Sequence, residues 1–334
     1  MSKYGFKIFS ITVAAVLTLL NSVCPSKYDE PIDSLNGGDP FIVEDGDDCY
    51  YTYTLGNRIE IFKVNSFKDL TVTDRKVVYR SGNNGIKGQI WAPEIHKIGN
   101  RWYIVSCAVF DKNAVPRGKM PEADEYDGHS DYYRYGFVLE SENEDIFSDY
   151  TFKGILSPDG LNNIDGTYLK KDGKLYYISS SYHNVGHQCI YISEMENPYT
   201  LKEGSSEMLS EPEYKWEKTG WKVNEGPAVL YNGDNIHIVY SASGYSSGGY
   251  TLGMLTFKGY NVMKKGDWDK CSTRLTFNRA SKSIYNAGHC SFLYRENGNI
   301  YMVYHATKKK IFSESRRLTY INRVRFFNDI PILM

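Results

Sequence analysis

Apolar and polar positions form one hairpin-like pattern that recurs along the chain. Each copy has a short polar or proline-containing start, an apolar strand, a glycine-containing turn and a second strand rich in aromatic and β-branched residues. Asp-Gly, Gly-Asn and Asn-Gly pairs between two strand-like runs are typical of β-hairpins. The copies are Asp39–Thr54, Ala92–Ser106, Asp165–Ser180, Glu225–Ser241 and His289–His305. Their predicted turn glycines are Gly46, Gly99, Gly173, Gly233 and Gly298.

The spacing of these copies predicts the fold. Successive starts lie about 50 to 75 residues apart, which leaves room for about four short strands per unit. A β-sandwich would give turn signals at shorter and more even spacing, and no long amphipathic helical pattern competes. The sequence therefore predicts an all-β protein, a five-bladed β-propeller formed as a single domain over residues 36–334.

Two stretches interrupt the repeats and are expected to be long loops. Residues 111–135 are charged and aromatic without alternation, and residues 194–221 are similarly polar. Loops of this length in a compact domain are usually functional or disordered. Their aromatic residues favour a role at the rim of a pocket, and plain solvated surface is the alternative.

The N-terminus has the pattern of an export signal. Lys3 and Lys7 precede an apolar run, Ile8–Leu20, that is short for a membrane span. Residues 1–24 are thus expected to be a signal peptide and residues 25–35 a linker, with an uncleaved anchor as the alternative. Cys24 follows the apolar run as in a bacterial lipoprotein junction, although Val23 fits that junction poorly. The protein is expected to be exported to the periplasm, the cell surface or the medium, with lipid at Cys24 as its one membrane attachment.

Composition narrows the class of partner. With 39 Lys and Arg against 40 Asp and Glu, the chain has no electrostatic footprint for nucleic acid. Its 29 Tyr, 15 Phe and 5 Trp suit sugar binding, because flat rings pack on the apolar faces of sugars. The five cysteines besides Cys24 match no zinc pattern and are expected to be small buried side chains without a disulfide framework.

The starts of the five copies carry the candidate chemistry. Equivalent positions in a propeller converge on its central channel, so these starts would face one cavity. They are Asp39, the Trp91-Ala92 pair, Asp165, Glu225 and His289. Like charges gathered in this way are costly unless they share protons or find donors, and the stability of a core gives no reason to gather them. Taken singly, each acid has an ordinary interpretation as a turn residue or a strand end.

Glycoside hydrolysis is the reaction that needs such a set. One carboxylate activates water, a second protonates the leaving oxygen, and a third can keep the pKa of the acid high. The segment Gly244–Gly248 (GYSSG) matches the letters of a G-x-S-x-G nucleophile elbow, but no helical pattern follows it as that elbow requires. No H-E-x-x-H or Cys/His ligand spacing is present. No cofactor is expected to be required. A calcium ion in the central channel, held through water near His289, is left open.

Several segments resemble the marker segments of glycoside hydrolase family 43, and the match runs from about Asn36 to the C-terminus. They are GGDPFIV (37–43), IWAPEIHKIGNRWYI (90–104), NIDGTYL (163–169), VNEGPAVL (223–230) and NAGHCSF (286–292). The resemblance implies a five-bladed propeller with an inverting, single-displacement mechanism that acts on arabinose- and xylose-containing polymers. It implies that Asp39 is the general base, that Glu225 is the general acid, and that Asp165 raises the pKa of the acid and orients it.

The resemblance also suggests three residues that bind substrate. His289 lies where the family often has a Gly-Pro-Gly-His-type run, but the proline is replaced here, and it would contact the sugar or an ion. Arg317 matches an arginine that bonds the bound sugar, with the adjacent Arg316 as the alternative register. Trp91 would form a wall of the sugar pocket, or else pack as a core residue between blades.

The fourth copy and the segment Tyr250–Thr256 look most like exo-acting α-L-arabinofuranosidases. The expected function is removal of α-L-arabinofuranosyl residues from arabinan or arabinoxylan-type polysaccharides of plant origin. β-Xylosidase and endo-arabinanase are alternatives within the family. A propeller that only binds carbohydrate or protein is the alternative of another class, and it would have no need of acids at three starts.

Overall fold

β-Strands form most of the part of the chain that the structure describes. The computed structural model describes residues 31–32, 37–116, 118, 133–184, 187–276, 283–314 and 316–332. The helical elements within these residues are short 3-10 turns: η3 (Pro158–Gly160), η4 (Lys215–Glu217), η5 (Lys265–Asp267) and η7 (Phe312–Glu314). The predicted all-β class is confirmed.

The strands fall into consecutive groups of antiparallel neighbours. The first is β1 (Phe41–Asp45), β2 (Asp48–Thr52), β3 (Arg58–Ser66) and β4 (Asp69–Arg80). The second is β5 (Ile86–Ile98), β6 (Arg101–Phe110), β7 (Arg134–Ser141) and β8 (Tyr150–Leu156). The third is β9 (Asn163–Lys171), β10 (Lys174–Asn184) and β11 (His187–Asn197), with β12 (Thr200–Leu201) and β13 (Glu207–Ser210) beside β11.

The remaining strands follow the same order. The fourth group is β14 (Lys222–Asn232), β15 (Asn235–Ala242), β16 (Thr251–Phe257) and β17 (Trp268–Lys270). The fifth is β18 (Tyr285–Tyr294), β19 (Ile300–Thr307) and β20 (Arg317–Arg323), and the ribbon β21 (Arg325–Phe327) with β22 (Ile330–Ile332) follows it. A short parallel pairing of β11 with β14 joins the third and fourth groups into one sheet.

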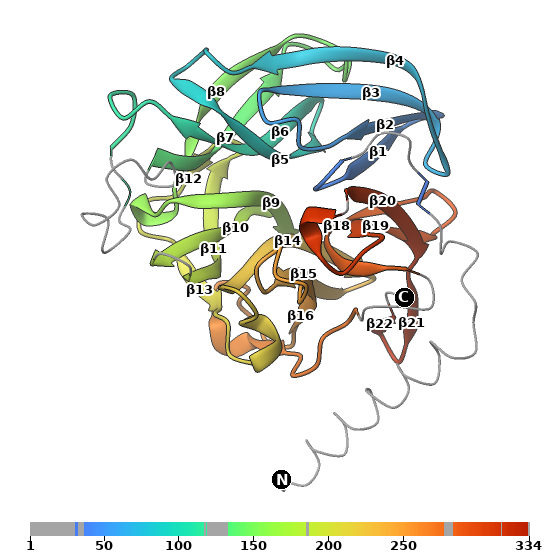
Figure 1. Cartoon of the computed structure of the whole chain (residues 1–334). Coiled ribbons are helices and arrows are strands. Elements are labelled where there is room, and N and C mark those ends of the chain that lie inside the picture. Colours follow the sequence, from blue (N-terminus) through green and yellow to red (C-terminus); the bar gives the residue numbers. More distant parts are fainter. Residues whose placement is uncertain are drawn as a thin grey trace, which may run out of the picture.

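The groups lie around a common centre, and the first strand of each lies nearest to it (Figure 1). Each of these inner strands contacts the next: β1 contacts β5, β5 contacts β9, β9 contacts β14, β14 contacts β18, and β18 contacts β1. Residues far apart in the sequence are therefore neighbours at the centre of the molecule.

The five predicted hairpins are confirmed. β1 pairs with β2, β5 with β6, β9 with β10, β14 with β15 and β18 with β19, in each case antiparallel. Every predicted turn glycine has a positive φ, between 56° and 76°, a conformation that costs glycine little because it lacks a Cβ atom. These are Gly46, Gly99, Gly173, Gly233 and Gly298.

Each inner strand is preceded or interrupted by a left-handed residue near its start. The pairing of β5, β9, β14 and β18 shifts register there, as in a β-bulge, which re-aims a neighbouring side chain. The left-handed residues are Asp39, Ala92, Asp165, Gly226 and His289. In the fourth copy this residue is Gly226, so Glu225 comes one residue before the position predicted for it.

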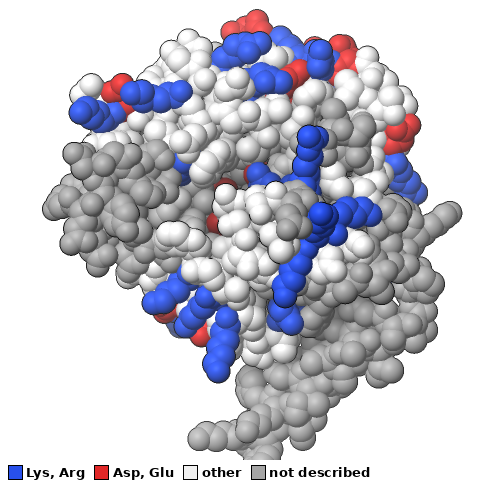
Figure 2. All heavy atoms as spheres, viewed as in Figure 1, with Lys and Arg blue, Asp and Glu red and all other residues white. Residues whose placement is uncertain are grey.

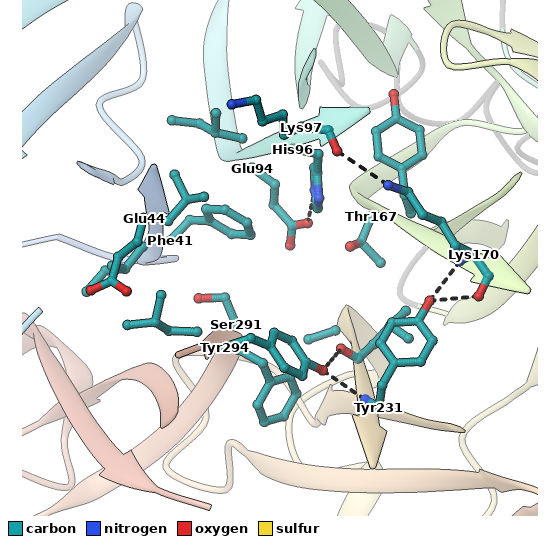
Figure 3. Close-up of a pocket in the computed structure, with 18 residues that line it drawn as sticks. Phe41, Glu44, Glu94, His96, Lys97, Thr167, Lys170, Tyr231, Ser291 and Tyr294 are labelled. Atoms are coloured by element: carbon teal, nitrogen blue, oxygen red, sulfur yellow. Dashed lines mark hydrogen bonds and ion pairs between the residues drawn. The ribbon is translucent and has the colours of Figure 1, made fainter. Parts of the chain in front are cut away.

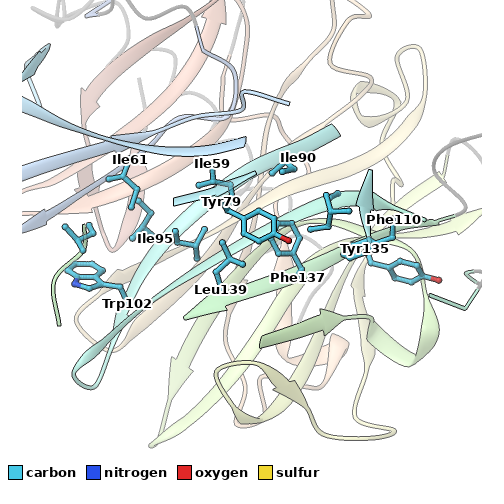
Figure 4. Packing of buried hydrophobic residues seen from close by; sticks show 14 of the residues in the cluster. Ile59, Ile61, Tyr79, Ile90, Ile95, Trp102, Phe110, Tyr135, Phe137 and Leu139 are labelled. Carbon is cyan, nitrogen blue, oxygen red and sulfur yellow. The ribbon is translucent and has the colours of Figure 1, made fainter. Parts of the chain in front are cut away.

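Apolar side chains fill the space between the first and second groups (Figure 4). Ile59 of β3, Ile95 of β5 and Trp102 of β6 are fully buried there. The indole N–H of Trp102 donates to the carbonyl oxygen of Glu144 at 2.9 Å, so its polar atom is satisfied within the core. This packing fixes one inner strand against the next and so sets the positions of the strand starts.

The stretch 194–221 is not the continuous loop that was predicted. β11 runs to Asn197, and β12 and β13 pair with it, because polar segments can still supply backbone hydrogen bonds to an open strand edge. The stretch 111–135 lies mostly outside the described residues, as do the predicted signal peptide 1–24, the lipidation site Cys24 and most of the linker 25–35.

Two further findings concern the described residues alone. None of them belongs to a helix long and apolar enough to cross a membrane. The cysteines among them are free: Cys49, Cys107, Cys189 and Cys290 are buried, and Cys271 is partly exposed. The prediction that these cysteines are small buried side chains is therefore correct for four of the five.

Candidate active site

A cavity of about 550 Å³ opens at the centre of the molecule, where the inner strands begin. Figure 2 shows a hollow near the centre of this face with acidic atoms at its base. Every residue predicted for the site lines the cavity: Asp39, Trp91, Asp165, Glu225, His289 and Arg317. The structure thus brings together residues at, or directly next to, the starts of all five repeats, and Arg317 from the last strand of the fifth group.

Asp39 is held by donors from three sides. Its Oδ1 accepts a hydrogen bond from Arg317 Nη1 at 3.0 Å, and its Oδ2 accepts one from the Thr54 hydroxyl at 2.7 Å. His289 Nδ1 lies 3.3 Å from Oδ1. Burial alone would raise the pKa of Asp39, but Arg317 and His289 outweigh burial and hold that pKa well below its usual range. Asp39 is therefore ionised near neutral pH and keeps its charge well into the acidic range.

Arg317 reaches Asp39 because Gly38 leaves room for it. A Cβ atom at Gly38 would lie 2.0 Å from the guanidinium carbon of Arg317. The side chain of Arg317 is 26% exposed, so part of the guanidinium faces the cavity. Arg316, the alternative in the predicted register, is exposed and does not line the cavity. Of these two arginines, the structure places Arg317 at the site.

His305 fixes the backbone of Asp39. Its Nδ1 accepts a hydrogen bond from the backbone N–H of Asp39 at 3.2 Å, so this nitrogen carries a lone pair and not a proton. Burial, with the nearby charge of Arg317, lowers the pKa of His305 well below its ordinary value. The imidazole is consequently neutral, and its 3.6 Å approach to the Asp39 carboxylate is not an ion pair.

His289 lies between two of the acids. Its Nδ1 is 3.3 Å from Asp39 Oδ1 and 3.9 Å from Asp165 Oδ2. Burial opposes its charged form, but the negative charges of the nearby acids, Asp39 and then Asp165, outweigh burial and raise the pKa of His289. A Cβ atom at Gly226 would lie 3.1 Å from the same Nδ1, so the glycine after Glu225 lets the ring fit closely.

Asp165 and Glu225 have less support from cations. Asp165 Oδ2 accepts a hydrogen bond from the backbone N–H of Gly226 at 3.0 Å, next to Glu225 in the chain. Burial raises the pKa of Asp165 to about 6, against the opposing charge of His289. Burial, together with the charge of Asp165, raises the pKa of Glu225 to about 8. Glu225 therefore keeps its proton near neutral pH, where Asp39 has lost its own.

Trp91 forms one wall of the cavity and packs against the side chain of Arg134. The guanidinium carbon of Arg134 lies 3.6 Å from the centre of its ring, a cation–π contact. Arg134 is fully buried and also bonds the backbone carbonyl of Gln89. The backbone N–H of Ala92 donates to the Thr54 hydroxyl at 2.8 Å, and that hydroxyl in turn donates to Asp39. The wall and the acid are thus connected through Thr54.

Four residues with direct roles in this geometry were not predicted: Thr54, Arg134, His305 and Tyr250, whose phenol donates to Glu225 Oε1 at 2.9 Å. A signal for two of them was present, because Thr54 and His305 are the last residues of the first and fifth repeats. In an antiparallel hairpin, the end of the second strand lies beside the start of the first. The polar residues at the repeat ends were therefore as informative as the acids at the repeat starts.

A second cavity of about 300 Å³ lies along the same inner strands, and every one of those strands contributes to its lining (Figure 3). In it, His96 Nε2 lies 2.8 Å from Glu94 Oε2, and Tyr231 bonds the backbone of Lys170. Glu94 and Glu44 both line this cavity; Glu94 is hydrogen-bonded to His96, and Glu44 is in an ion pair with Arg295. The acids with opposed ionisation occur in the first cavity.

Among the described residues, no group of three or more His, Cys, Asp or Glu side chains is arranged to hold a metal ion.

Comparison with known proteins assigns the chain to a family. The profile described as glycosyl hydrolases family 43 matches residues 28–331. The chain belongs to glycosyl hydrolases family 43. A relative from Streptomyces chartreusis, named extracellular exo-alpha-(1->5)-L-arabinofuranosidase, is 30% identical over 304 residues, covering 86% of this chain and 84% of that protein.

Two other similar proteins extend this comparison. Alpha-L-arabinofuranosidase 43 of Humicola insolens is 28% identical over 90% of this chain, and the match spans 61% of the length of that relative. The crystal structure of alpha-L-arabinofuranosidase from Lactobacillus brevis superposes with a TM-score of 0.78 at 27% identity, covering 90% of this chain and 94% of that one. The resemblance to family 43 found in the sequence is confirmed.

Proposed function

We propose that this protein hydrolyses terminal α-L-arabinofuranosyl residues from arabinan or arabinoxylan-type polysaccharides by an inverting acid/base mechanism. One observation carries the proposal: two carboxyl groups of one cavity have opposite surroundings. Asp39 lies against Arg317 and His289, whereas Glu225 is bonded by the neutral phenol of Tyr250. Near neutral pH the first is ionised and the second is protonated, as a general base and a general acid must be.

In this mechanism Asp39 removes a proton from water as the water attacks the anomeric carbon. Glu225 gives its proton to the leaving glycosidic oxygen, so the bond to the aglycone breaks with inversion. An inverting site needs about 6.5–9.5 Å between its two carboxyl groups to admit that water. Asp165 has a tuning role: its charge raises the pKa of Glu225, and its bond to Gly226 N–H steadies the backbone beside the acid.

The other residues of the cavity suit the binding of a sugar. We infer that Arg317 and His289 donate to hydroxyl groups of the arabinofuranosyl ring and that Trp91 packs on its apolar face. Trp221 and Tyr245, which are 55% and 49% exposed, also line the cavity. The ring centre of Tyr245 lies 5.8 Å from the guanidinium carbon of Arg317, whereas Trp221 comes just before β14, the strand that carries Glu225. We infer that Trp221 packs on the leaving part of the substrate.

The choice of arabinose over xylose is supported by the relatives, since the curated proteins named above are arabinofuranosidases.

The ring of contacts among the inner strands supports a closed five-bladed propeller over residues 36–334. The extracellular description of the Streptomyces relative supports export, with residues 1–24 as the signal peptide. Mass spectrometry of the mature N-terminus would test both the cleavage and lipidation at Cys24.

The decisive experiment is a substrate panel with matched variants. Wild-type protein should release arabinose from an aryl α-L-arabinofuranoside and from arabino-oligosaccharides. Asp39→Asn and Glu225→Gln should lower kcat/KM on the oligosaccharides by about 10²–10⁴-fold. Glu60→Gln is the control, because Glu60 is a buried carboxylate paired with Arg58 outside the cavity. Anomeric NMR should show inversion.

Each other outcome has a definite meaning. Preference for an aryl β-D-xyloside would make the protein a xylosidase, and internal cleavage of debranched arabinan would make it an endo-arabinanase. Binding to arabinan without release of sugar from any pentoside would refute the enzyme. Retained configuration would refute the role of Asp39 as a general base.

A further inference from the structure

We propose that Tyr250 is a positioning residue that holds the carboxyl group of Glu225 in one orientation, with Oε2 turned toward the leaving oxygen. This inference rests on the proposed role of Glu225 as the general acid. Tyr250 immediately precedes β16 and is 3% exposed. Its phenol donates to Glu225 Oε1 at 2.9 Å. In a neutral carboxyl group the oxygen that accepts such a bond is the carbonyl oxygen, so the proton is left on Oε2.

The ring of Tyr250 has little freedom to turn. It stacks on the imidazole of His305 with ring centres 5.7 Å apart and an angle of 9° between the planes. On its edge, a Cβ atom at Gly288 would lie 2.3 Å from a ring carbon, so the absence of a side chain there makes room for the phenol. His305 also accepts a hydrogen bond from the backbone N–H of Asp39. The same imidazole therefore packs against Tyr250, beside the proposed acid, and fixes the backbone of Asp39, the proposed base.

Ser241 lies beside both the acid and the phenol. It is fully buried and pairs directly with Glu225 across β14 and β15. The backbone N–H of His289 donates to Ser241 Oγ at 2.7 Å, which fixes the place of the hydroxyl. Burial raises the pKa of the Tyr250 phenol, and the nearby Ser241 hydroxyl opposes that shift. Loss of this hydroxyl should therefore disturb the surroundings of the phenol less than loss of the phenol itself.

Positioning and acid strength have separable consequences. The bond from Tyr250 stabilises the charged form of Glu225, in opposition to burial and Asp165, which raise its pKa. Loss of the phenol should therefore raise the pKa of Glu225 further, and the alkaline limb of the pH profile should move upward. If acid strength were the whole effect, the variant would gain activity at alkaline pH. A freely rotating carboxyl group instead lowers the rate across the profile, because misplacement of a reacting group is costly.

The test is Tyr250→Phe, assayed with leaving groups of graded pKa. Dinitrophenyl arabinofuranoside needs little protonation of its leaving oxygen, whereas alkyl arabinofuranosides and arabino-oligosaccharides need it fully. We expect a loss of roughly 10- to 100-fold on the oligosaccharides and less than about threefold on the dinitrophenyl glycoside. The alkaline limb should rise by about half a pH unit. Ser241→Ala should have the same effects to a smaller degree.

Tyr240→Phe is the matched control. Tyr240 donates to Glu217 Oε1 over the same 2.9 Å, is equally buried, and does not line the cavity. The Tyr240→Phe variant should be less thermally stable than the wild type, but its kcat/KM should depend on the leaving group in the same way.

Three outcomes would overturn the inference. One is an equal loss on all leaving groups with an unmoved alkaline limb in Tyr250→Phe. A second is unchanged kinetics in both Tyr250→Phe and Ser241→Ala. If Glu225→Gln itself retains activity on oligosaccharides, the acid assignment fails and this inference fails with it. If Glu225→Gln is inactive while Tyr250→Phe has the kinetics of the wild type, the role of Tyr250 is refuted and the assignment of Glu225 as the acid stands.

Discussion

Gly38→Ala should raise the pKa of Asp39 without removing any polar group from the site. The new methyl group would lie 2.0 Å from the guanidinium carbon of Arg317, and ordinary contact begins at about 3.4 Å. Gly38 does not have a positive φ, so alanine is not strained there. Arg317 is a long, partly exposed side chain and can yield. We expect it to move by about 1.5 Å, taking its Nη1 from 3.0 Å to about 4.5 Å from Asp39 Oδ1.

The size of the effect follows from Coulomb's law. With an effective dielectric constant of about 20, attraction falls from about 5.5 to about 3.7 kcal/mol, which corresponds to about 1.3 pKa units. Partial exposure of Arg317 reduces this to about one unit. Asp39 must be ionised to act, so activity is lost as pH falls through its pKa. Raising that pKa moves the acid limb upward. The stability lost with the ion pair should be greatest above the unfolded-state pKa and should shrink at lower pH.

The assay is kcat/KM on an aryl α-L-arabinofuranoside as a function of pH, beside thermal unfolding at several pH values. Gly266→Ala is the control, because its Cβ atom would meet only Lys264, at 3.9 Å. Arg317→Met should shift the acid limb further, and Gly38→Ala should add nothing to it. An acid limb that moves in Arg317→Met but not in Gly38→Ala would refute the steric argument. Full additivity of the two changes would refute the claim that Gly38 acts through Arg317.

Three further predictions follow from the same cavity. Asp165→Asn should lower the pKa of Glu225 and move the alkaline limb downward by about one unit, since a like charge is removed; an upward shift would contradict the tuning role. Trp221→Ala should raise KM for arabino-oligosaccharides by about tenfold and leave aryl glycosides almost unchanged, whereas Tyr260→Ala, at a 99% exposed aromatic, should change neither. EDTA treatment should leave kcat/KM unchanged within about twofold, and recovery by added calcium after a larger loss would establish an ion in the channel.

The repeat explains why so much of the cavity could be predicted. Glycine turns mark the hairpins, and hairpins at regular intervals place their starts around one centre, so Asp39, Asp165 and His289 meet although they are far apart in sequence. Arg317 was found through family resemblance and not through the repeat. Its contact with Asp39 depends on Gly38, whose significance appears only when the guanidinium is seen against it.

The remaining residues of the cavity could not be predicted for definite reasons. Tyr250 lies before the third strand of its group, beyond the repeated hairpin, and one tyrosine among 29 has no distinguishing mark. Arg134 lies at the end of a stretch without alternation. The opposed ionisation of Asp39 and Glu225 was implied by the family resemblance but could not be inferred from the repeat, because it depends on which acid each cation approaches.

The positions of Arg317 and His289 explain how acids at equivalent places in the repeat can have the different roles proposed for them. Asp39 and Asp165 are buried and Glu225 is partly buried, and loss of water around each carboxyl group by itself raises its pKa. The difference is that Arg317 and His289 both approach the same oxygen of Asp39, whereas the hydrogen-bond donor to Glu225 is a neutral phenol. Moving one positive charge would therefore change the chemistry more than exchanging one acid for another. For that reason, a change at Gly38, which bears no functional group, tests the proposed mechanism as directly as a change at an acid.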